Sequence, residues 1–309
     1  MPDARVFAST VGMDLDAWLE ARRHGVGSSD APGVCGLDPW NSPLSLWLDK
    51  TGQAKPREAG EAAYWGTVLE PVVAEEFARQ HPEWRVARRN AILQHPTIDH
   101  MLLNVDRLVR VPGVGHIPLE IKTTSAYAED DWDGGGVPDR AVVQVQHSLA
   151  VLGAPYAFVA ALIGGQRYVE RLVPRDDRFI GDLLAVEADF WNYVQSMTPP
   201  PADGSDASRA ALLALFPEPT AGKEIALPPD ASGLLAAYDE WSRAEKAATT
   251  AKQAAQNALC ALLGDAETGL LAGERVCTWK QQHRDAHMVG ASDFRQFRRV
   301  TPRAAKKSA

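Results

Sequence analysis

Apolar residues are spaced in two ways along the chain, and the two spacings predict different elements. In several stretches they recur three and four positions apart, which is typical of helices with one buried face. The predicted helices cover residues 14–25, 42–52, 61–80, 140–152, 176–197 and 230–263. Short runs in which apolar residues flank or alternate with polar ones predict strands instead. These strands cover residues 84–93, 104–110, 117–124, 156–163 and 167–173.

The order of these elements predicts an α/β fold in which helices flank both faces of a central mixed sheet. The proline-rich sequence TPPPADGS at 198–205 predicts a linker. We therefore expect a domain over residues 1–198, a linker with a short helix over 199–229, and a helical C-terminal extension over 230–309. The extension would include a small hairpin near 269–280 and a basic tail from Arg295 to Lys307, suited to contact DNA or a partner.

Charged residues of two neighbouring strands predict a metal site on a hairpin. Glu120 and Lys122 are two positions apart and therefore point to one face of their strand. The turn PGVG at 112–115 can bring Asp106 beside Glu120, and adjacent carboxylates repel unless a cation lies between them. Such oxygen ligands suit Mg²⁺, with Mn²⁺ as an alternative. A solvated strand face with an ordinary Glu and Lys gives the same pattern, so these residues alone leave both interpretations open.

Asp106 and the sequence EIK at 120–122 resemble the signature of the PD-(D/E)xK nuclease superfamily. Three further segments are similar to its YqaJ-like viral recombinase branch, phage exonucleases related to lambda exonuclease. These segments are GVGSSD at 25–30, WGTVLE at 65–70 and QVQH at 144–147. The resemblance covers residues 18–173 and implies the PD-(D/E)xK core, a central mixed sheet flanked by helices.

The resemblance also implies a catalytic centre. Its catalytic residues would be Asp106, Glu120, Lys122, Gln144 and Glu70. Its metal ligands would be Asp106, Glu120, Glu70 and the carbonyl of Ile121. Lys122 and Gln144 would position a water for attack on phosphorus, and His147 would support Gln144. Taken without the resemblance, Glu70 is an ordinary solvated helix residue and His147 a structural one.

A second set of residues matches the family positions that hold the 5′ phosphate of a DNA end. Arg22 and Ser29 occupy these positions, and Ser28 can replace Ser29. The alternative is that Arg22 balances its helix dipole while the serines cap the next helix. Relatives that thread DNA carry another basic residue shortly after the catalytic lysine, whereas this chain has Ala126, Ala128 and acidic residues there.

The function implied is a Mg²⁺-dependent exonuclease that digests one strand of linear double-stranded DNA from its 5′ end and leaves a 3′ overhang. Family members work beside a single-strand annealing protein, and lambda-type members form homo-oligomeric rings around DNA. Two alternatives keep the site: an endonuclease of restriction or repair type, and a noncatalytic module that binds DNA ends. Paired carboxylates also serve glycoside hydrolysis, but the lysine has no role in that reaction.

Composition changes this picture only in part. The formal net charge of −8 argues against a nucleic-acid ligand, yet arginines and Lys122 gather around the proposed site. Three scattered cysteines without CxxC spacing argue against a zinc or iron–sulfur site and indicate a reducing cytoplasm. No apolar run is long enough for a membrane span and no secretion signal is recognisable, so we expect a cytoplasmic protein, in a bacterial host cell if phage-encoded.

Overall fold

The computed structural model describes residues 4–54 and 60–283. The chain divides into two compact units between Pro217 and Glu218, and each unit is described by itself. No helix of the described residues has the length and apolar character needed to cross a membrane.

A five-stranded sheet forms the centre of the first unit, in the order β3-β6-β7-β8-β9. Its strands are β3 (Arg85–Ala87), β6 (Arg107–Val111), β7 (Gly115–Thr124), β8 (Tyr156–Ile163) and β9 (Arg167–Pro174). Strand β7 pairs antiparallel with β6 and parallel with β8, so the sheet is mixed. The expected α/β fold with a central mixed sheet is confirmed.

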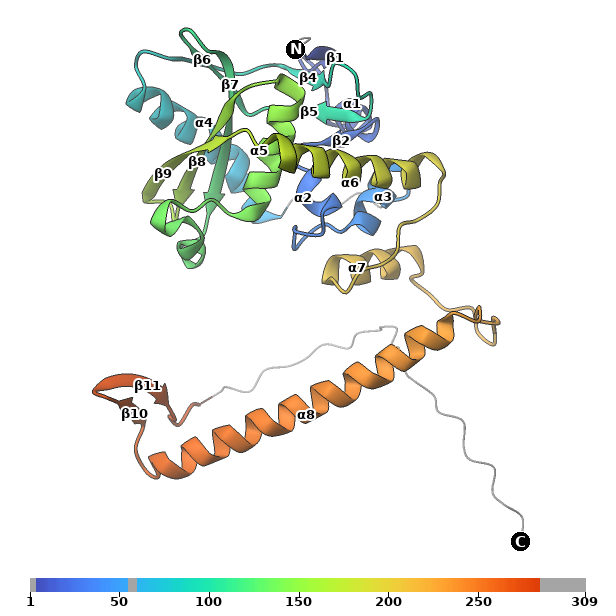
Figure 1. Cartoon of the computed structure of the whole chain (residues 1–309), viewed down its shortest axis with the longest axis vertical. Coiled ribbons are helices and arrows are strands. Elements are labelled where there is room, and N and C mark those ends of the chain that lie inside the picture. Colours follow the sequence, from blue (N-terminus) through green and yellow to red (C-terminus); the bar gives the residue numbers. More distant parts are fainter. Residues whose placement is uncertain (1–3, 55–59, 284–309) are drawn as a thin grey trace. The chain divides into compact units, whose positions relative to one another are not determined.

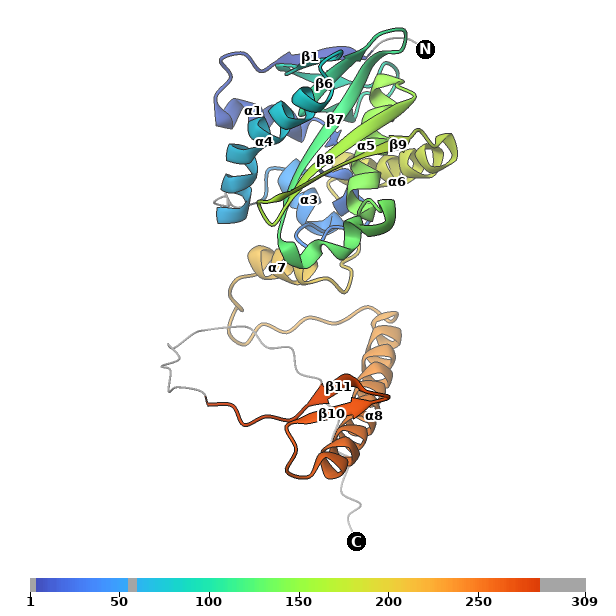
Figure 2. The ribbon, with the colours of Figure 1, turned by 90° about the vertical axis from the view of Figure 1, so that its left-hand side faces the viewer.

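Helices cover both faces of this sheet, as Figure 2 shows. Helix α4 (Glu61–Gln80) packs on one face and α5 (Asp139–Leu152) on the other. Helix α6 (Asp177–Gln195) packs against α5 from outside. The largest core cluster joins these layers and includes the fully buried side chains of Phe77, Ile117, Leu119 and Leu149.

A second sheet in the first unit has the order β1-β4-β5-β2. Its strands are β1 (Arg5–Ser9), β2 (Val26–Gly27), β4 (Ala91–Gln94) and β5 (Met101–Leu103). The prediction of one strand over 84–93 is therefore wrong, because β3 and β4 belong to different sheets. Three exposed polar residues, Arg88 to Asn90, carry the chain from one sheet to the other. Alternation of apolar and polar residues does not reveal which partner each short strand pairs with.

A smaller core lies beside this sheet and includes residues of α2 (Ala31–Val34), α3 (Pro43–Lys50) and α6. Helix α1 (Leu15–Arg23) contacts α3 but has no buried residue. Asp14 caps α1 through the amide of Ala17, and Ser42 forms a capping box on α3. Helix α7 (Asp206–Leu215) packs on α3 and buries Ala211 in this core (Figure 1).

The acidic segment 126–136 forms short helical turns that pack on the sheet. It holds two 3-10 helices, η1 (Ala126–Ala128) and η2 (Asp130–Gly135). The Trp132 side chain is buried in the main core, and Arg167 forms ion pairs with Glu129 and Asp133. An apolar anchor and two ion pairs therefore fix the loop to the sheet.

The second unit contains one long helix, α8 (Ala231–Leu263), of 33 residues. A hairpin follows it, formed by β10 (Thr268–Leu271) and β11 (Glu274–Thr278). These elements agree with the predicted helix and closing hairpin. The predicted basic tail, 295–307, lies outside the described residues.

Candidate active site

The hairpin of β6 and β7 positions the two central carboxylates. Arg107 pairs with Leu119 in the antiparallel register, so Asp106, which directly precedes β6, lies opposite Glu120. The turn between the strands contains Gly113 with a φ of 78°, a backbone conformation that residues other than glycine rarely adopt. Asp106 Oδ2 accepts a 2.8 Å hydrogen bond from the Ile121 amide, which fixes the carboxylate against β7.

Lys122 and Gln144 enclose the carboxylate of Glu120. Its Oε1 accepts hydrogen bonds of 2.7 Å from Lys122 Nζ and of 2.7 Å from Gln144 Nε2. Lys122 Nζ also donates to Gln144 Oε1 at 2.6 Å, so the three side chains form a closed triangle. Glu120 and Gln144 are buried, and Lys122 is half-buried. Helix α5 thus delivers Gln144 to the same face of the sheet that carries Glu120 and Lys122.

The electrostatics of Asp106 indicate a site suited to a cation. Burial and the neighbouring Glu120 carboxylate hold the pKa of Asp106 well above its usual range. The Ile121 amide and the Lys122 ammonium act in the opposite direction without overcoming these effects. A cation between the carboxylates would remove their repulsion, and hard oxygen donors of this kind fit Mg²⁺ or Mn²⁺.

Glu70 is held apart from this pair. Its Oε1 accepts from Arg107 and, at 3.3 Å, from Arg88. Its charge still makes a small contribution to the raised pKa of Asp106. Within the described residues, no group of three or more His, Cys, Asp and Glu side chains is arranged to hold a metal ion. The structure therefore brings together two of the three predicted carboxylates and holds the third in an ion pair.

The predicted 5′-phosphate residues form a second cluster at the end of α1. Arg22 Nη2 donates to Ser29 Oγ at 2.9 Å and to Asp30 Oδ1 at 2.8 Å. Its guanidinium also lies over the Trp18 ring, with 4.7 Å from Cζ to the ring centroid. These contacts fix the orientation of Arg22, which is what recognition of an anion requires.

Asp30 and Lys50 hold Arg22 in place through an ion pair and a hydrogen bond to its backbone. The sequence did not predict either of them as a site residue. Lys50 Nζ is fully buried, where it donates to Asp30 Oδ2 at 2.6 Å and to the Arg22 carbonyl at 3.0 Å. Burial alone would raise the pKa of Asp30, but the charges of Lys50 and Arg22 outweigh it and hold that pKa well below its usual range. The available signal was a lysine on a helix otherwise predicted to be buried, because buried charges need a partner.

One cavity connects the two clusters. Its volume is about 150 Å³, and it is lined by residues of both sets, including Arg22, Ser28, Ser29, Asp106 and Gln144. The predicted 5′-phosphate residues and two of the predicted catalytic residues, Asp106 and Gln144, thus line one cavity. More than 75 positions separate Ser29 from Asp106 in sequence.

His147 has a different set of contacts from the one expected. Its Nδ1 lies 2.7 Å from Glu187 Oε1 on α6, and its Nε2 lies 2.7 Å from the Leu102 carbonyl on β5. Both partners are acceptors, so both ring nitrogens carry a proton when Glu187 is ionised. The residue joins α5 to α6 and to the second sheet.

The fold and the hairpin site define the class of protein as an α/β protein of the PD-(D/E)xK type. Residues 17–155 match the model of the YqaJ-like viral recombinase domain. The chain is also 43% identical over 229 residues to the uncharacterized protein YqaJ of Bacillus subtilis. The matched region covers 72% of this chain and 70% of that protein. The chain therefore belongs to the YqaJ-like viral recombinase family.

The chain is also similar to solved structures. The structure of LHK-Exo in complex with dAMP has a TM-score of 0.50 at 20% identity and covers 59% of this chain and 93% of that one. A second structure of this alkaline exonuclease, from Laribacter hongkongensis, covers the same shares at 18% identity with a TM-score of 0.48. The first of these structures, with a TM-score of 0.50, agrees with the fold described above.

Proposed function

We propose that the chain is a metal-dependent exonuclease that degrades one strand of linear double-stranded DNA from its 5′ end. The observation that carries this proposal is the cavity shared by Arg22 and Asp106. A terminal phosphate held by Arg22 would place the adjoining phosphodiester near the two carboxylates. The enzyme would then release one nucleotide in each cycle and leave a 3′ overhang.

Asp106, Glu120 and the Ile121 carbonyl would hold Mg²⁺, or Mn²⁺ in its place. When bound, such a cation neutralises charge on phosphoryl oxygens and makes a bound water more acidic. Lys122 and Gln144 would contribute to the same reaction through their side chains. The ammonium of Lys122 stabilises negative charge on the phosphate, and its contact with Gln144 sets the direction in which both groups face the attacking water.

We propose a conditional role for Glu70 as the third metal ligand. Its carboxylate accepts from Arg107 and Arg88, and it would have to exchange these partners for the cation. The buried Arg107 would then be free to pair with the negative charge of the DNA. Glu70 thereby remains a predicted ligand, with a lower affinity for the metal than Asp106 and Glu120.

Recognition of the 5′ phosphate would rest on Arg22 with the hydroxyls of Ser28 and Ser29. A guanidinium binds phosphate through charge-assisted, bidentate hydrogen bonds, and Trp18 and Asp30 already hold this one in place. The likeness to LHK-Exo supports the product expected from this arrangement, because that protein was solved with dAMP, a deoxynucleoside monophosphate.

We also propose that the 3′ overhang passes to a single-strand annealing protein, in the cytoplasm of a bacterial host, and that several copies of the chain assemble around DNA. These proposals rest on the family resemblance. The nuclease domain would contain the site, with the C-terminal helical part aiding assembly or DNA contact.

The decisive experiment compares purified protein on linear and on closed circular duplex DNA, each with and without Mg²⁺. An exonuclease degrades only the linear DNA, and only with the metal. Cleavage of the circular DNA would favour the endonuclease alternative. Binding of linear DNA without any loss of nucleotides would favour the end-binding module.

A further inference from the structure

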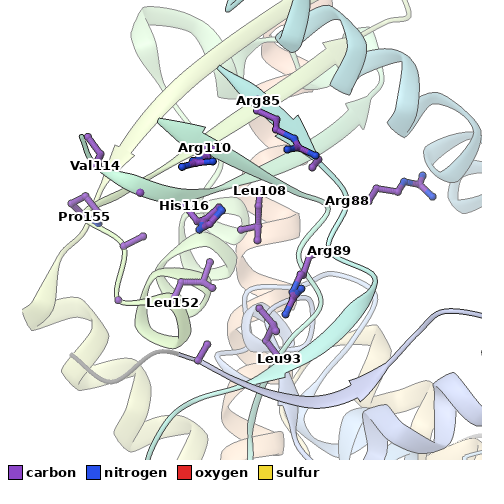
Figure 3. A pocket seen from close by; sticks show the side chains of 15 residues that line it. Arg85, Arg88, Arg89, Leu93, Leu108, Arg110, Val114, His116, Leu152 and Pro155 are labelled. Atoms are coloured by element: carbon purple, nitrogen blue, oxygen red, sulfur yellow. The ribbon is translucent and has the colours of Figure 1, made fainter. Parts of the chain in front are cut away.

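A larger hollow lies at the other end of the β6–β7 hairpin (Figure 3). Its volume is about 710 Å³. Four arginines and a histidine line it: Arg85, Arg88, Arg89, Arg110 and His116. The other described residues around it are apolar side chains and glycines, and none of them is acidic. We call it the arginine hollow.

Three of its basic side chains form a row across the sheet. Arg85 on β3 lies directly opposite Arg110 on β6, and Arg110 lies directly opposite His116 on β7. Directly paired residues share a face of the sheet, and like charges in such pairs destabilise it. All three are exposed, and none of them forms an ion pair or a side-chain hydrogen bond with another described residue. The chain as a whole carries a net charge of −8, so a surplus of positive charge does not explain the row.

Protection of a sheet edge explains only part of this arrangement. Edge strands carry exposed charges that prevent pairing with other chains, and β3 is an edge strand. Arg85 fits this explanation. Arg110 and His116 do not, because β6 and β7 lie inside the sheet. An anionic ligand between the Arg85 and Arg110 side chains would remove the repulsion between their charges.

The row lies on the same face of the sheet as the candidate active site. In the hairpin register, Leu108 pairs with Pro118 and Arg110 with His116, so Asp106 and Glu120 continue the same face. Asp106, directly before β6, and Arg110 are four positions apart, a distance of about 13 Å at about 3.3 Å per residue. Arg88 connects the two regions, because it lines the arginine hollow and also binds Glu70.

We propose that the arginine hollow binds the phosphate backbone of the DNA molecule whose end lies in the active site. This inference rests on the proposed function and adds a second, sequence-independent contact to it. Several guanidinium groups, of which Arg88 alone has an acidic partner among the described residues, match a ligand with repeated phosphates better than one with a single anionic group. The short distance to Asp106 on a continuous face favours the substrate over an unrelated acidic protein.

The test compares two double variants with the same change in charge. Arg85→Ala with Arg110→Ala removes the row. Arg178→Ala with Arg209→Ala is the matched control, since both control residues are exposed arginines, on α6 and α7, whose side chains form no hydrogen bond or ion pair with another described residue. Binding of a labelled linear duplex is measured by fluorescence anisotropy in EDTA over a series of salt concentrations. Only purified protein and DNA are present.

The row variant should bind the duplex at least about tenfold more weakly at moderate salt, and its slope of log affinity against log salt should fall by up to about 2, since each phosphate contact contributes about 0.9. The control should match the wild type. Arg85→Lys with Arg110→Lys should restore most of the slope because it keeps the charges. Unchanged affinity and slope in the row variant, or an equal loss in both alanine variants, would overturn the proposal; the first result would leave an acidic protein as the remaining ligand class.

The wild-type protein separates this proposal from the one on function. If it neither binds nor degrades linear DNA with Mg²⁺, the proposed function fails. If it degrades linear DNA while the row variant shows the same KM for DNA as the wild type, only the second contact fails. A raised KM in the row variant, with the control at the wild-type value, supports both.

Discussion

The guanidinium of Arg107 binds the carboxylate of Glu70, and both residues lie beside the site that the sequence assigns to a metal. Helix α4 and strand β6 supply one partner each, 37 positions apart. This ion pair keeps a third carboxylate near Asp106 without adding it to the central pair. We infer that binding of a cation and the opening of this ion pair are coupled, which can be measured.

Replacement of Glu70 by Gln should raise the Mg²⁺ concentration needed for half-maximal cleavage by about 10-fold or more, the range typical for residues that tune a metal site. The control is Glu75→Gln, because Glu75 is exposed on the same helix. Metal titrations of the initial rate provide the measurement. An identical Mg²⁺ requirement in the Glu70 variant and the wild type would remove Glu70 from the set of ligands.

Replacement of Asp106 by Asn should abolish cleavage and stabilise the metal-free protein. The raised pKa of Asp106 means that its ionised form is disfavoured in the folded state at neutral pH. Asn keeps an oxygen that can accept from the Ile121 amide and carries no charge. The loss of activity is checked on linear DNA and the gain in Tm by calorimetry in EDTA. A lower Tm together with full activity would contradict both parts of this prediction.

Lys122→Ala should lower the cleavage rate by about 10²- to 10³-fold, the effect of removing one group that stabilises developing charge. The fold should persist, since Lys122 is half-buried and its two partners also bind each other. Single-turnover cleavage with saturating DNA isolates this effect from binding. Wild-type rates in this variant would exclude the lysine from the chemistry.

Much of the site could be predicted from the sequence because its residues are local to two strands and one turn. The spacing of Glu120 and Lys122 fixes their common face, and the short turn fixes Asp106 beside them. The partner of Glu70 could not be predicted in this way. Arg107 reaches it through the packing of α4 on the sheet, and nothing in the local pattern of either element records that contact.

The fold shows the same division between local and distant information. The helix predicted over 61–80 agrees with α4 because twenty residues repeat one periodic pattern. The break between β3 and β4 was missed, since two short strands in different sheets alternate just as one strand does. Lys50 was missed for a related reason: its partners, Asp30 and the Arg22 carbonyl, lie in other elements.

A 5′-phosphorylated linear duplex should be degraded faster than its 5′-hydroxyl counterpart, and Arg22→Ala should remove the difference. A hydrogen bond to a charged group contributes about 1.5–3 kcal/mol, so the preference should be at least about 10-fold. Arg23→Ala is a suitable control, because Arg23 lies next to Arg22 but pairs with Glu20. Equal rates on both substrates in the wild type would contradict this role of Arg22.

The buried pair of His147 and Glu187 should make stability depend on pH. Burial lowers the pKa of His147, but the charge and hydrogen bond of Glu187 outweigh it and raise the pKa above the ordinary value. A raised pKa in the folded state stabilises the protein below the unfolded pKa of about 6.5, and this contribution is lost as the pH rises through the folded pKa. Urea denaturation at a series of pH values should therefore show that the free energy of unfolding falls as the pH rises through this range.

The variant His147→Gln should lose that pH dependence and should be about 3 kcal/mol less stable below neutral pH, because Glu187 is left buried without its charged partner. Adding Glu187→Gln should recover part of the loss, since the double variant leaves no unpaired charge. If His147→Gln kept the wild-type dependence of the free energy of unfolding on pH, a group other than His147 would be responsible for it.

Two truncated chains, one ending at Ser196 and one at Pro217, should differ in stability. The predicted linker 199–229 contains α7, which packs on α3, and Ala207, Ser208 and Ala211 on α7 are buried. A chain ending at Ser196 exposes the core around Trp47, whose indole Nε1 donates to the Tyr193 carbonyl beside the cut. A chain ending at Pro217 keeps these contacts and matches the compact first unit.

We therefore expect the longer chain to fold with a single cooperative transition. The shorter chain should have a Tm several degrees lower, because exposed apolar surface reduces stability. Calorimetry of both chains measures this, and equal Tm values would show that α7 contributes no stability to the first unit.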